Sequence, residues 1–315
     1  MAALAHFVRT NYNLSRQRPH LQDSSRSAPV IIEVAINGAR DKAANPHVPL
    51  TEDEIVADIL RCVAAGASIV HAHAGEPVVG SGGHHDAGPY RRAFARVRQE
   101  HPQLVMYPTL PGGGVGTSME ARLAHVAALA REGLCNVVPV DPGTMNYGRI
   151  DSSGRPPVHE QVYQTTFADV AWAFGFCAQQ KLACTMSLFE PGFARLVQAH
   201  LDAGTLPDAS IVKLEFSAGA RLFGLTPDAC GLDAWLRLFD AGRIPWMVTL
   251  RDGSPADGLA QLAIGRGGHV RVGIEDHGGA PPRSNESLVS EIASLCTRMG
   301  RRAATPGEVH DLITR

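Results

Sequence analysis

The 315-residue sequence lacks the features that would point to a membrane protein or a nucleic-acid-binding protein. No apolar run approaches the roughly 18 residues of a membrane span. The 29 basic and 31 acidic residues nearly cancel, and no basic stripe is interleaved with aromatic residues. We therefore expect a partner that is neither a membrane nor a nucleic acid.

Redox and targeting signals are also scarce. None of the six cysteines forms a C-x-x-C pair, so buried reduced thiols in a cytoplasmic protein are the simplest interpretation. Residues 1–28 lack a continuous apolar stretch and a convincing cleavage site, which favours a polar extension over a signal peptide. This extension is expected to be disordered or to contact a neighbouring subunit, and residues 29–315 are expected to form one catalytic domain.

The sequence does contain one pattern that repeats eight times from residue 29 onward. A run of apolar and β-branched residues ends in Gly, Pro, Asn or Asp, and a helical pattern follows. The runs cover residues 30–38, 67–75, 104–114, 136–146, 182–192, 211–219, 244–253 and 269–279. Each run is therefore predicted to hold a strand.

Helical patterns separate these runs. Residues 50–67 begin with Thr51 and Glu54 at the spacing of a capping box, and residues 117–133 and 284–300 each end at a glycine typical of a helix C-terminus. Strands that alternate with helices form parallel sheets, and eight such units favour a closed (β/α)8 TIM barrel. An open α/β sheet is the alternative, but no G-x-G-x-x-G motif follows the first run.

The second run ends in a pair of histidines, His71 and His73. They share one face of the predicted strand because side chains alternate along a strand. Two hydrogen-bonded core histidines are the ordinary interpretation. At the C-terminal end of a barrel strand, where such barrels have their active sites, an H-x-H pair favours a metal site, which needs a third ligand that is often a carboxylate.

The eighth and first runs supply polar residues that converge on this pair. Arg271 and Glu275 share a face of the eighth run, and Glu33 and Asn37 share a face of the first. In a closed barrel the first strand lies between the second and the eighth, so these side chains meet on one side of the mouth. Charged groups inside a barrel are costly unless they pair or bind something. A structural Arg–Glu pair is the alternative to a metal and substrate site.

Three further places carry candidate polar groups. The third run ends in YPTLPGGGVG, where the hydroxyl of Thr109 and the main-chain N–H groups around Gly112 and Gly113 are suited to a carboxylate or phosphate. Glycine clusters also simply make turns.

The sixth and seventh runs add charged groups. Lys213 and Glu215 share a face of the sixth run, which favours a buried ion pair and leaves open a substrate-selecting or acid–base pair. Arg251, at the end of the seventh run, either grips an anionic substrate or is a solvated loop residue.

Four stretches, EVAINGA, GASIVHAHA, DPGTMNYG and GGHVRVGIED, together make the chain resemble the β-keto acid cleavage enzyme family from residue 29 to about residue 313. The resemblance implies a (β/α)8 barrel, a homotetramer and one catalytic zinc ion per chain. It also implies a reaction that joins a β-keto acid to acetyl-CoA and yields acetoacetate and a new acyl-CoA.

The resemblance also implies roles for individual residues. The zinc ligands fall on His71, His73 and Glu275. The remaining family positions fall on Asp276 as general base, Arg271 as its partner, Glu33 as a substrate-binding residue and Thr109 as a hydroxyl donor. Arg271 would either hold Asp276 ionised and oriented or bind the developing oxyanion. Gly112, Gly113 and Asn37 are added as substrate contacts from the residues themselves.

The sequence departs from the family in the surroundings of this site. An acidic residue common on strand five is replaced by Ser187, with Glu190 nearby, and Glu215 on the next strand could take its place. His277 follows the Glu-Asp pair where the family has asparagine. The metal ligands are intact, so the departures suggest a different substrate. The alternative is a metal-dependent carbon–carbon lyase or hydrolase on the same barrel that does not use CoA.

Overall fold

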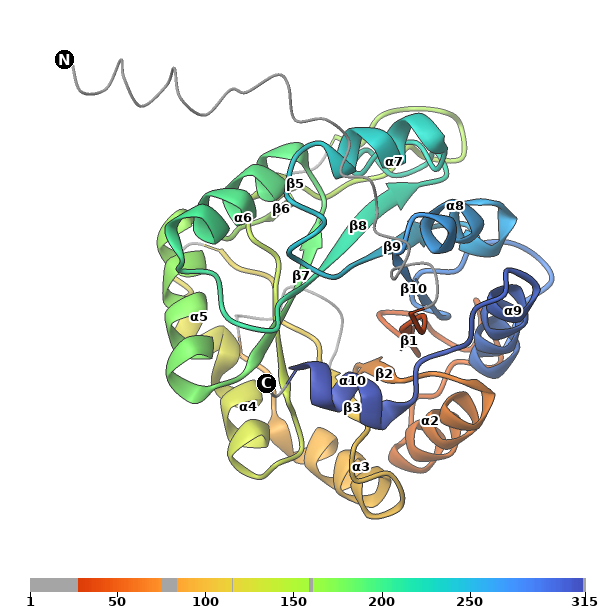
Figure 1. Cartoon of the computed structure of the whole chain (residues 1–315), viewed down its shortest axis with the longest axis horizontal. Helices are drawn as coiled ribbons and strands as arrows, with labels where there is room; N and C mark the ends of the chain where they lie inside the picture. Colours follow the sequence, from red (N-terminus) through yellow and green to blue (C-terminus); the bar gives the residue numbers. More distant parts are fainter. Residues whose placement is uncertain (1–27, 75–83, 115, 159–160, 314–315) are drawn as a thin grey trace.

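The computed structural model of this protein describes residues 28–74, 84–114, 116–158 and 161–313. Eight parallel strands lie at the centre, surrounded by a ring of helices, which confirms the predicted (β/α)8 barrel (Figure 1). The barrel strands are β1 (Ile32–Ala35), β2 (Ile69–Ala72), β3 (Val105–Pro108), β4 (Val137–Val140), β7 (Ala183–Leu188), β8 (Ile211–Ser217), β9 (Trp246–Arg251) and β10 (His269–Val272). Each lies within one of the eight runs.

The helices follow the strands in alternation. They are α2 (Glu52–Ala65), α3 (Ala87–Glu100), α4 (Met119–Arg131), α5 (Phe167–Gln180), α6 (Pro191–Ala203), α7 (Ala229–Leu236), α8 (Leu259–Gly265), α9 (Asn285–Arg298) and α10 (Pro306–Ile313), with the 3-10 turn η2 (Pro255–Asp257) before α8. None of the helices in the described ranges is long and apolar enough to cross a membrane.

The strands are hydrogen-bonded in the order β3-β2-β1-β10-β9-β8-β7-β4. Strands β3 and β4 contact each other and bring the ring round on itself. Within the described residues no ladder of hydrogen bonds joins these two strands, and we call this place the seam. Pro108 in β3 and Pro139 in β4 have no N–H to donate there. This order places β1 between β2 and β10, as a closed barrel requires.

Helix ends follow the local sequence closely. The hydroxyl of Thr51 accepts from the Glu54 amide, and the Glu54 carboxylate accepts from the Thr51 amide, so the predicted capping box is present. In α4 and α9 the predicted terminal glycines, Gly133 and Gly300, lie one residue beyond the cap, each with positive φ. Glycine is favoured there because a left-handed residue follows the last helical turn.

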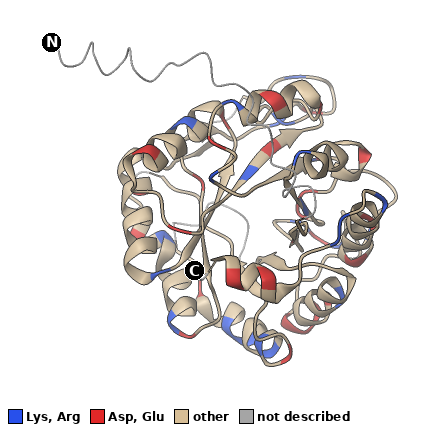
Figure 2. Cartoon of the chain, in the orientation of Figure 1, with Lys and Arg blue, Asp and Glu red and all other residues tan. Residues whose placement is uncertain are grey.

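The core is apolar between strands and helices and charged inside the barrel. Side chains such as Val34, Val70 and Val272 are buried against the helices. Figure 2 shows charged positions mainly on the outer helices, with others on strand β8 inside the ring. Five cysteines are buried and unpaired, as predicted, whereas Cys230 is exposed. It lies in the first turn of the short helix α7, which leaves this position on the surface.

Two features outside the barrel strands were not predicted. A short antiparallel hairpin, β5 (Met145–Asn146) and β6 (Val162–Tyr163), follows β4 at the C-terminal end of the barrel. Helix α10 contacts β3, and the residues before it pair with Val30 just ahead of β1, so α10 lies at the N-terminal end of the barrel (Figure 1). Residues 1–27 of the expected N-terminal extension lie outside the described residues.

Candidate active site

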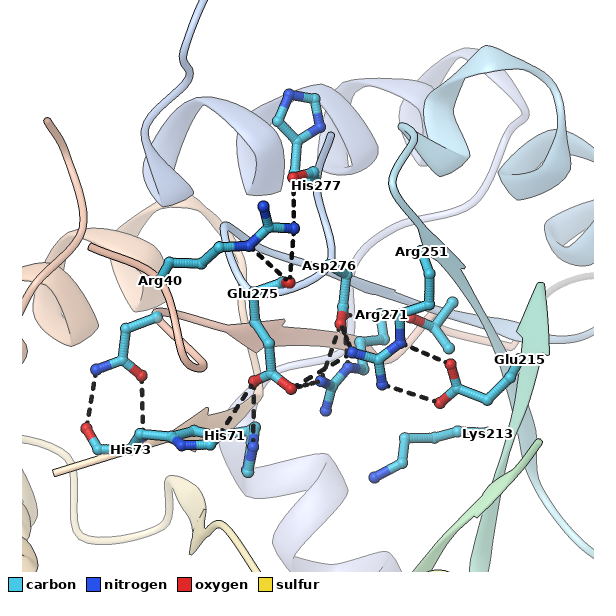
Figure 3. A network of polar contacts seen from close by, with 12 residues as sticks. Arg40, His71, His73, Lys213, Glu215, Arg251, Arg271, Glu275, Asp276 and His277 are labelled. Atoms are coloured by element: carbon cyan, nitrogen blue, oxygen red, sulfur yellow. Dashed lines mark hydrogen bonds and ion pairs between the residues drawn. The ribbon is translucent and has the colours of Figure 1, made fainter. Parts of the chain in front are cut away.

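His71, His73 and Glu275 come together at the C-terminal mouth of the barrel (Figure 3). One potential ligand atom from each lies within 4.8 Å of the other two. Glu275 Oε2 lies 3.2 Å from His71 Nε2 and 3.8 Å from His73 Nε2. This oxygen is buried and accepts no well-aligned hydrogen bond from the described residues. A two-histidine, one-carboxylate set with its free oxygen facing both rings fits a divalent metal such as zinc.

Glycines let Glu275 reach the histidines. Gly38, just after β1, has φ +56°, and a Cβ atom there would lie 2.4 Å from Glu275 Cγ. Gly273, just after β10, has φ +140°, and a Cβ there would lie 2.1 Å from the Ala35 carbonyl oxygen. Both positions therefore require glycine. The close approach of β10 to β1 is what carries Glu275 to the end of β2.

The expected alternation of side chains does not extend to Glu275. Strand β10 ends at Val272, and residues 273–276 form a turn in which Asp276 N and His277 N both donate to the Gly273 carbonyl, at 3.1 and 2.8 Å. Because of this turn, Glu275 and Asp276 both point into the mouth, whereas a continued strand would send them to opposite faces.

Arg271 holds both carboxylates in place. Its Nε donates to Asp276 Oδ2 at 2.7 Å, and its Nη2 lies 3.2 Å from Asp276 Oδ1 and 3.0 Å from Glu275 Oε1. Its Nη1 donates to Glu33 Oε1 at 2.9 Å. All three nitrogens of this buried guanidinium are therefore engaged, and Glu275 Oε2 is left facing the histidines.

A second arginine, Arg251, also forms an ion pair with Asp276. The Nη1 atom of Arg251 pairs with Asp276 Oδ1, and its Nε and Nη2 donate to the two oxygens of Glu215 at 2.8 and 3.2 Å (Figure 3). Arg251 is 13% exposed, so it is not a solvated loop residue. Ser187 lies on β7 in register with Lys213, whereas Glu215 reaches Asp276 through Arg251.

Lys213 and Glu215 are both buried, but they do not pair with each other. Lys213 Nζ donates to the hydroxyl of Tyr107 at 3.0 Å and lies 4.0 Å from Glu33 Oε1, while Glu215 binds Arg251. Residues two apart on a strand point the same way but stand about 6.6 Å apart along it. Each therefore finds its partner on a different strand.

Tyr107 on β3 is a site residue that the sequence did not reveal. Its hydroxyl donates to Glu33 Oε1 at 2.5 Å, and its ring lies 4.7 Å from the His71 ring, centroid to centroid. Tyr107 and Thr109 are two apart, so the alternation of side chains was the signal that could have found it. Glu33 is fully buried, and its other oxygen, Oε2, has no hydrogen-bond partner among the described residues.

The protonation of the cluster follows from burial and charge. Burial lowers the pKa of His73 to about 3, so its ring is neutral and free to bind a metal at neutral pH. Burial alone would raise the pKa of Glu275, but Arg271 and His71 outweigh it and hold this pKa well below its ordinary value. Arg251 and Arg271 likewise overcome burial and lower the pKa of Asp276. Both carboxylates are therefore ionised.

Two asparagines support the cluster through the main chain. Asn37 Oδ1 accepts from the His73 amide at 2.9 Å, and its Nδ2 donates to the His73 and Pro49 carbonyls at 2.8 and 2.9 Å. Both of its amide hydrogens are used, so the geometry favours a supporting role for Asn37 over contact with substrate. Asn285 accepts from Ile274 N at 2.8 Å and thereby fixes the turn that carries Glu275.

The predicted substrate loop follows β3. Thr109, Gly112 and Gly113 are half-buried there, and the Thr109 carbonyl accepts a hydrogen bond from His125 Nε2 at 2.8 Å. Buried Arg122 donates to the Pro111 carbonyl at 2.9 Å and fixes the loop. A Cβ at Gly113 would lie 1.9 Å from the Gln164 carbonyl oxygen, so only glycine fits. Substrate binding by Thr109, Gly112 and Gly113 stays a prediction.

A (β/α)8 barrel with histidines and carboxylates clustered at the C-terminal ends of its strands is the architecture of a TIM-barrel enzyme. The model of the beta-keto acid cleavage enzyme family matches residues 29–314. The chain belongs to this family, as its sequence motifs predicted.

The sequences of three named relatives align with nearly the whole of this chain. The 3-keto-5-aminohexanoate cleavage enzyme of Fusobacterium nucleatum is 26% identical over 298 residues, covering 90% of this chain and 97% of the relative. The 3-dehydrocarnitine:acetyl-CoA trimethylamine transferase of Rhizobium meliloti is 25% identical and covers 90% and 96%. The 3-oxoadipate:acetyl-CoA acetyltransferase of Cupriavidus necator is 25% identical and covers 90% and 94%.

Solved structures support the fold. ObcA in its binary complex with oxaloacetate superposes with a TM-score of 0.59 at 16% identity, covering 85% of this chain and 67% of ObcA. The dihydropteroate synthase of Yersinia pestis gives a TM-score of 0.51 at 11% identity, covering 86% and 95%. At these identities the likeness concerns the barrel alone.

Proposed function

We propose that this protein is a zinc-dependent enzyme that condenses a β-keto acid with acetyl-CoA to give acetoacetate and a new acyl-CoA. The observation that carries the proposal is the meeting of His71, His73 and Glu275 at the mouth of a barrel that matches the family over residues 29–314. The names of the relatives support acetyl-CoA as co-substrate, because two of them are transferases named with acetyl-CoA and the third is a keto acid cleavage enzyme. The three names contain three different keto acids.

The donor set supports zinc as the metal. Two imidazole nitrogens and one carboxylate oxygen leave a coordination position open, as catalytic zinc sites do. When bound, Zn²⁺ would act as a Lewis acid on the ketone and acidify the carbon between the two carbonyls. The side chains that hold the site, Arg271 on Glu275 Oε1 and Asn37 on the main chain of His73, are already in place.

Asp276 is the base in the proposed reaction. It accepts a proton from the carbon between the ketone and the carboxylate, and that carbon attacks the thioester carbonyl of acetyl-CoA and expels the CoA thiolate. The thiolate then adds to the original ketone carbon, and the carbon–carbon bond breaks. Asp276 returns its proton to the released carbanion, which gives acetoacetate, and the remaining fragment leaves as its CoA thioester.

The two arginines have different tasks in this scheme. Arg271 has no nitrogen without a partner, so it orients Asp276 and Glu275 and does not bind the developing oxyanion. Arg251 is partly exposed at the mouth and pairs with Asp276 on the side facing β8. It therefore fixes the direction in which Asp276 can accept a proton.

The proposal is tested by metal content and by product. Elemental analysis should find one zinc per chain in the wild type and none in the His71→Ala/His73→Ala variant. Incubation with acetyl-CoA and a panel of β-keto acids should then release acetoacetate. Turnover that needs metal but ignores CoA would instead indicate a lyase or hydrolase, and a wild type without metal even after zinc is supplied would end the proposal.

The family resemblance also supports a homotetramer in the cytoplasm. Light scattering should then give a mass of about four times the 33.5 kDa of one chain. A monomer would remove this part of the proposal and leave the chemistry as it stands.

A further inference from the structure

Arg122 is a buried cation that lies outside the network of charges around Asp276. It belongs to the first half of α4, and only 1% of its surface is exposed. Arg251 and Arg271 pair with carboxylates, whereas every hydrogen-bond acceptor that the structure describes for Arg122 is a neutral oxygen. Burying a charged group is costly unless its donors are satisfied, so the positions of these acceptors show what Arg122 holds together.

The guanidinium of Arg122 joins two loops. Its Nε donates to the Pro111 carbonyl at 2.9 Å, in the glycine loop after β3. Its Nη1 donates to the Gln164 carbonyl and to the Thr165 hydroxyl, both at 3.1 Å, and its Nη2 donates to the Tyr163 hydroxyl at 2.8 Å. These three acceptors lie at the end of β6 and in the link to α5, within the connection that follows β4. One side chain is therefore bonded to the loops of both strands that border the seam.

The two loops also contact each other directly. A Cβ atom at Gly113 would lie 1.9 Å from the Gln164 carbonyl oxygen and 2.8 Å from Arg122 Nη1. In the described ranges no ladder of main-chain hydrogen bonds joins β3 to β4. Hydrogen bonds from a side chain therefore link the segments beyond this junction, where the strands themselves are not linked.

Helix α4 holds the glycine loop at a second point. His125 Nε2 lies 2.8 Å from the Thr109 carbonyl oxygen, which can only accept, so Nε2 carries the hydrogen. Burial lowers the pKa of His125 to about 4, so its ring is neutral at pH 7. Residues three apart share one face of a helix. Arg122 and His125 therefore bind two carbonyls of the same loop, those of Pro111 and Thr109.

We propose that Arg122 is a positioning residue for the β-keto acid. It links the glycine loop to the connection after β4 and thereby fixes Thr109, Gly112 and Gly113 in place for the substrate. The inference rests on the proposed function, because it concerns residues that are predicted to bind the substrate. The described partners of Arg122 do not include the candidate metal ligands. Its loss should therefore weaken the binding of the keto acid and leave zinc in place.

The first test replaces the guanidinium. Arg122→Met removes its hydrogen bonds and keeps an unbranched apolar side chain. With acetyl-CoA saturating, KM for a β-keto acid that the wild type accepts should rise by about tenfold, kcat should change less, and zinc content should stay at one per chain. Arg122→Lys should recover only part of the loss, because one ammonium cannot span acceptors on two loops. Arg131→Met, at an exposed position of the same helix, is the matched control.

The second test acts from the other side of the seam. Tyr163→Phe removes one acceptor of Arg122 and leaves the glycine loop itself unchanged. It should still raise KM for the keto acid, and the double variant with Arg122→Met should have the KM of Arg122→Met alone. Amide hydrogen exchange of residues 109–114 should be faster in both single variants and unchanged in Arg131→Met. This measurement needs no turnover.

The outcomes separate this inference from the proposed function. If the wild type releases no acetoacetate from any β-keto acid, the proposed function fails, and hydrogen exchange still tests the link between the loops. If the wild type is active but Arg122→Met and Tyr163→Phe keep its KM, the positioning role is wrong, whether or not exchange becomes faster. A lower melting temperature with unchanged KM would show that Arg122 serves stability alone. If Arg122→Met does not fold, Arg122→Lys and Tyr163→Phe decide.

Discussion

Glu275 and Asp276 are adjacent in the sequence, yet they should respond differently to loss of charge. Glu275 Oε2 faces the two histidines, so Glu275→Gln should weaken zinc binding by more than the roughly 100-fold typical of losing an outer-shell partner. Asp276 contacts two arginines and not the histidines, so Asp276→Asn should keep zinc and lower kcat by about 10²–10⁴-fold.

Elemental analysis and acetoacetate release measure the two effects separately. Equal loss of metal in both variants would mean that the assignment of ligand and base is wrong. Asparagine has nearly the same shape as aspartate. A melting temperature of the Asp276→Asn variant close to that of the wild type would therefore show that the turn after Gly273 is intact.

Gly38 gives a test of how closely Glu275 is held. In Gly38→Ala the new Cβ would collide with Glu275 Cγ, so zinc affinity should fall. Gly204→Ala is the matched control, since Gly204 has φ +67° and nothing within 4 Å of an added Cβ. Both changes should cost about 1–2 kcal/mol of backbone strain, and only the first should change the zinc titration. Parallel loss of affinity in both variants would refute this reading.

At the scale of single residues, the sequence predicted the residues that periodicity controls. His71 and His73 share a strand face, and a closed ring brings the end of β10 beside them, so the meeting of these histidines with Glu275 could be predicted. The direction of Asp276 could not, because it depends on a turn that begins at Gly273. Tyr107 could not be predicted as a partner of Glu33, because a tyrosine in an apolar strand is equally typical of an ordinary barrel core.

At the scale of elements, charged residues from three neighbouring strands are linked by ion pairs. Glu215 lies on β8, Arg251 ends β9, and Asp276 follows β10. If Glu215 acts on Asp276 only through Arg251, Glu215→Gln and Arg251→Met should each lower kcat, and the double variant should be no slower than Arg251→Met alone. The expected coupling energy is about 1–3 kcal/mol, measured from kcat at saturating acetyl-CoA.

The melting temperatures of the same two single variants and their double variant give an independent test of the coupling between Glu215 and Arg251. Arg251→Met leaves Glu215 buried without its cation, which typically costs about 3–5 kcal/mol, so the double variant should melt at a higher temperature than Arg251→Met. Additive effects on both kcat and melting would show that the two residues act separately. The partners themselves could not be predicted from sequence, because register between strands decides that Ser217, and not Glu215, lies opposite Arg251.

At the scale of the whole molecule, removing the proposed zinc ion should abolish activity without unfolding the protein. The core between strands and helices is apolar, and in the described ranges hydrogen-bonded ladders join the neighbouring barrel strands except at the seam, so folding should not require the metal. At free zinc about 1,000 times its dissociation constant, binding adds about 4 kcal/mol to stability. Chelation should therefore lower the melting temperature by several degrees, keep the far-ultraviolet circular dichroism and abolish acetoacetate release. Unfolding on chelation would contradict this.

The seam between β3 and β4 lies between the glycine loop that follows β3 and the loop that follows β4. Strands β2, β1 and β10, around the candidate metal ligands, are each hydrogen-bonded to a neighbouring strand on both sides. Among the residues that the structure describes, no ladder of hydrogen bonds joins the two strands that precede these loops. Substitutions in these loops should therefore change the surroundings of the proposed substrate site while the strands that lead to His71, His73 and Glu275 keep their register. A single scaffold of this kind can exchange one keto acid for another without rebuilding its catalytic machinery.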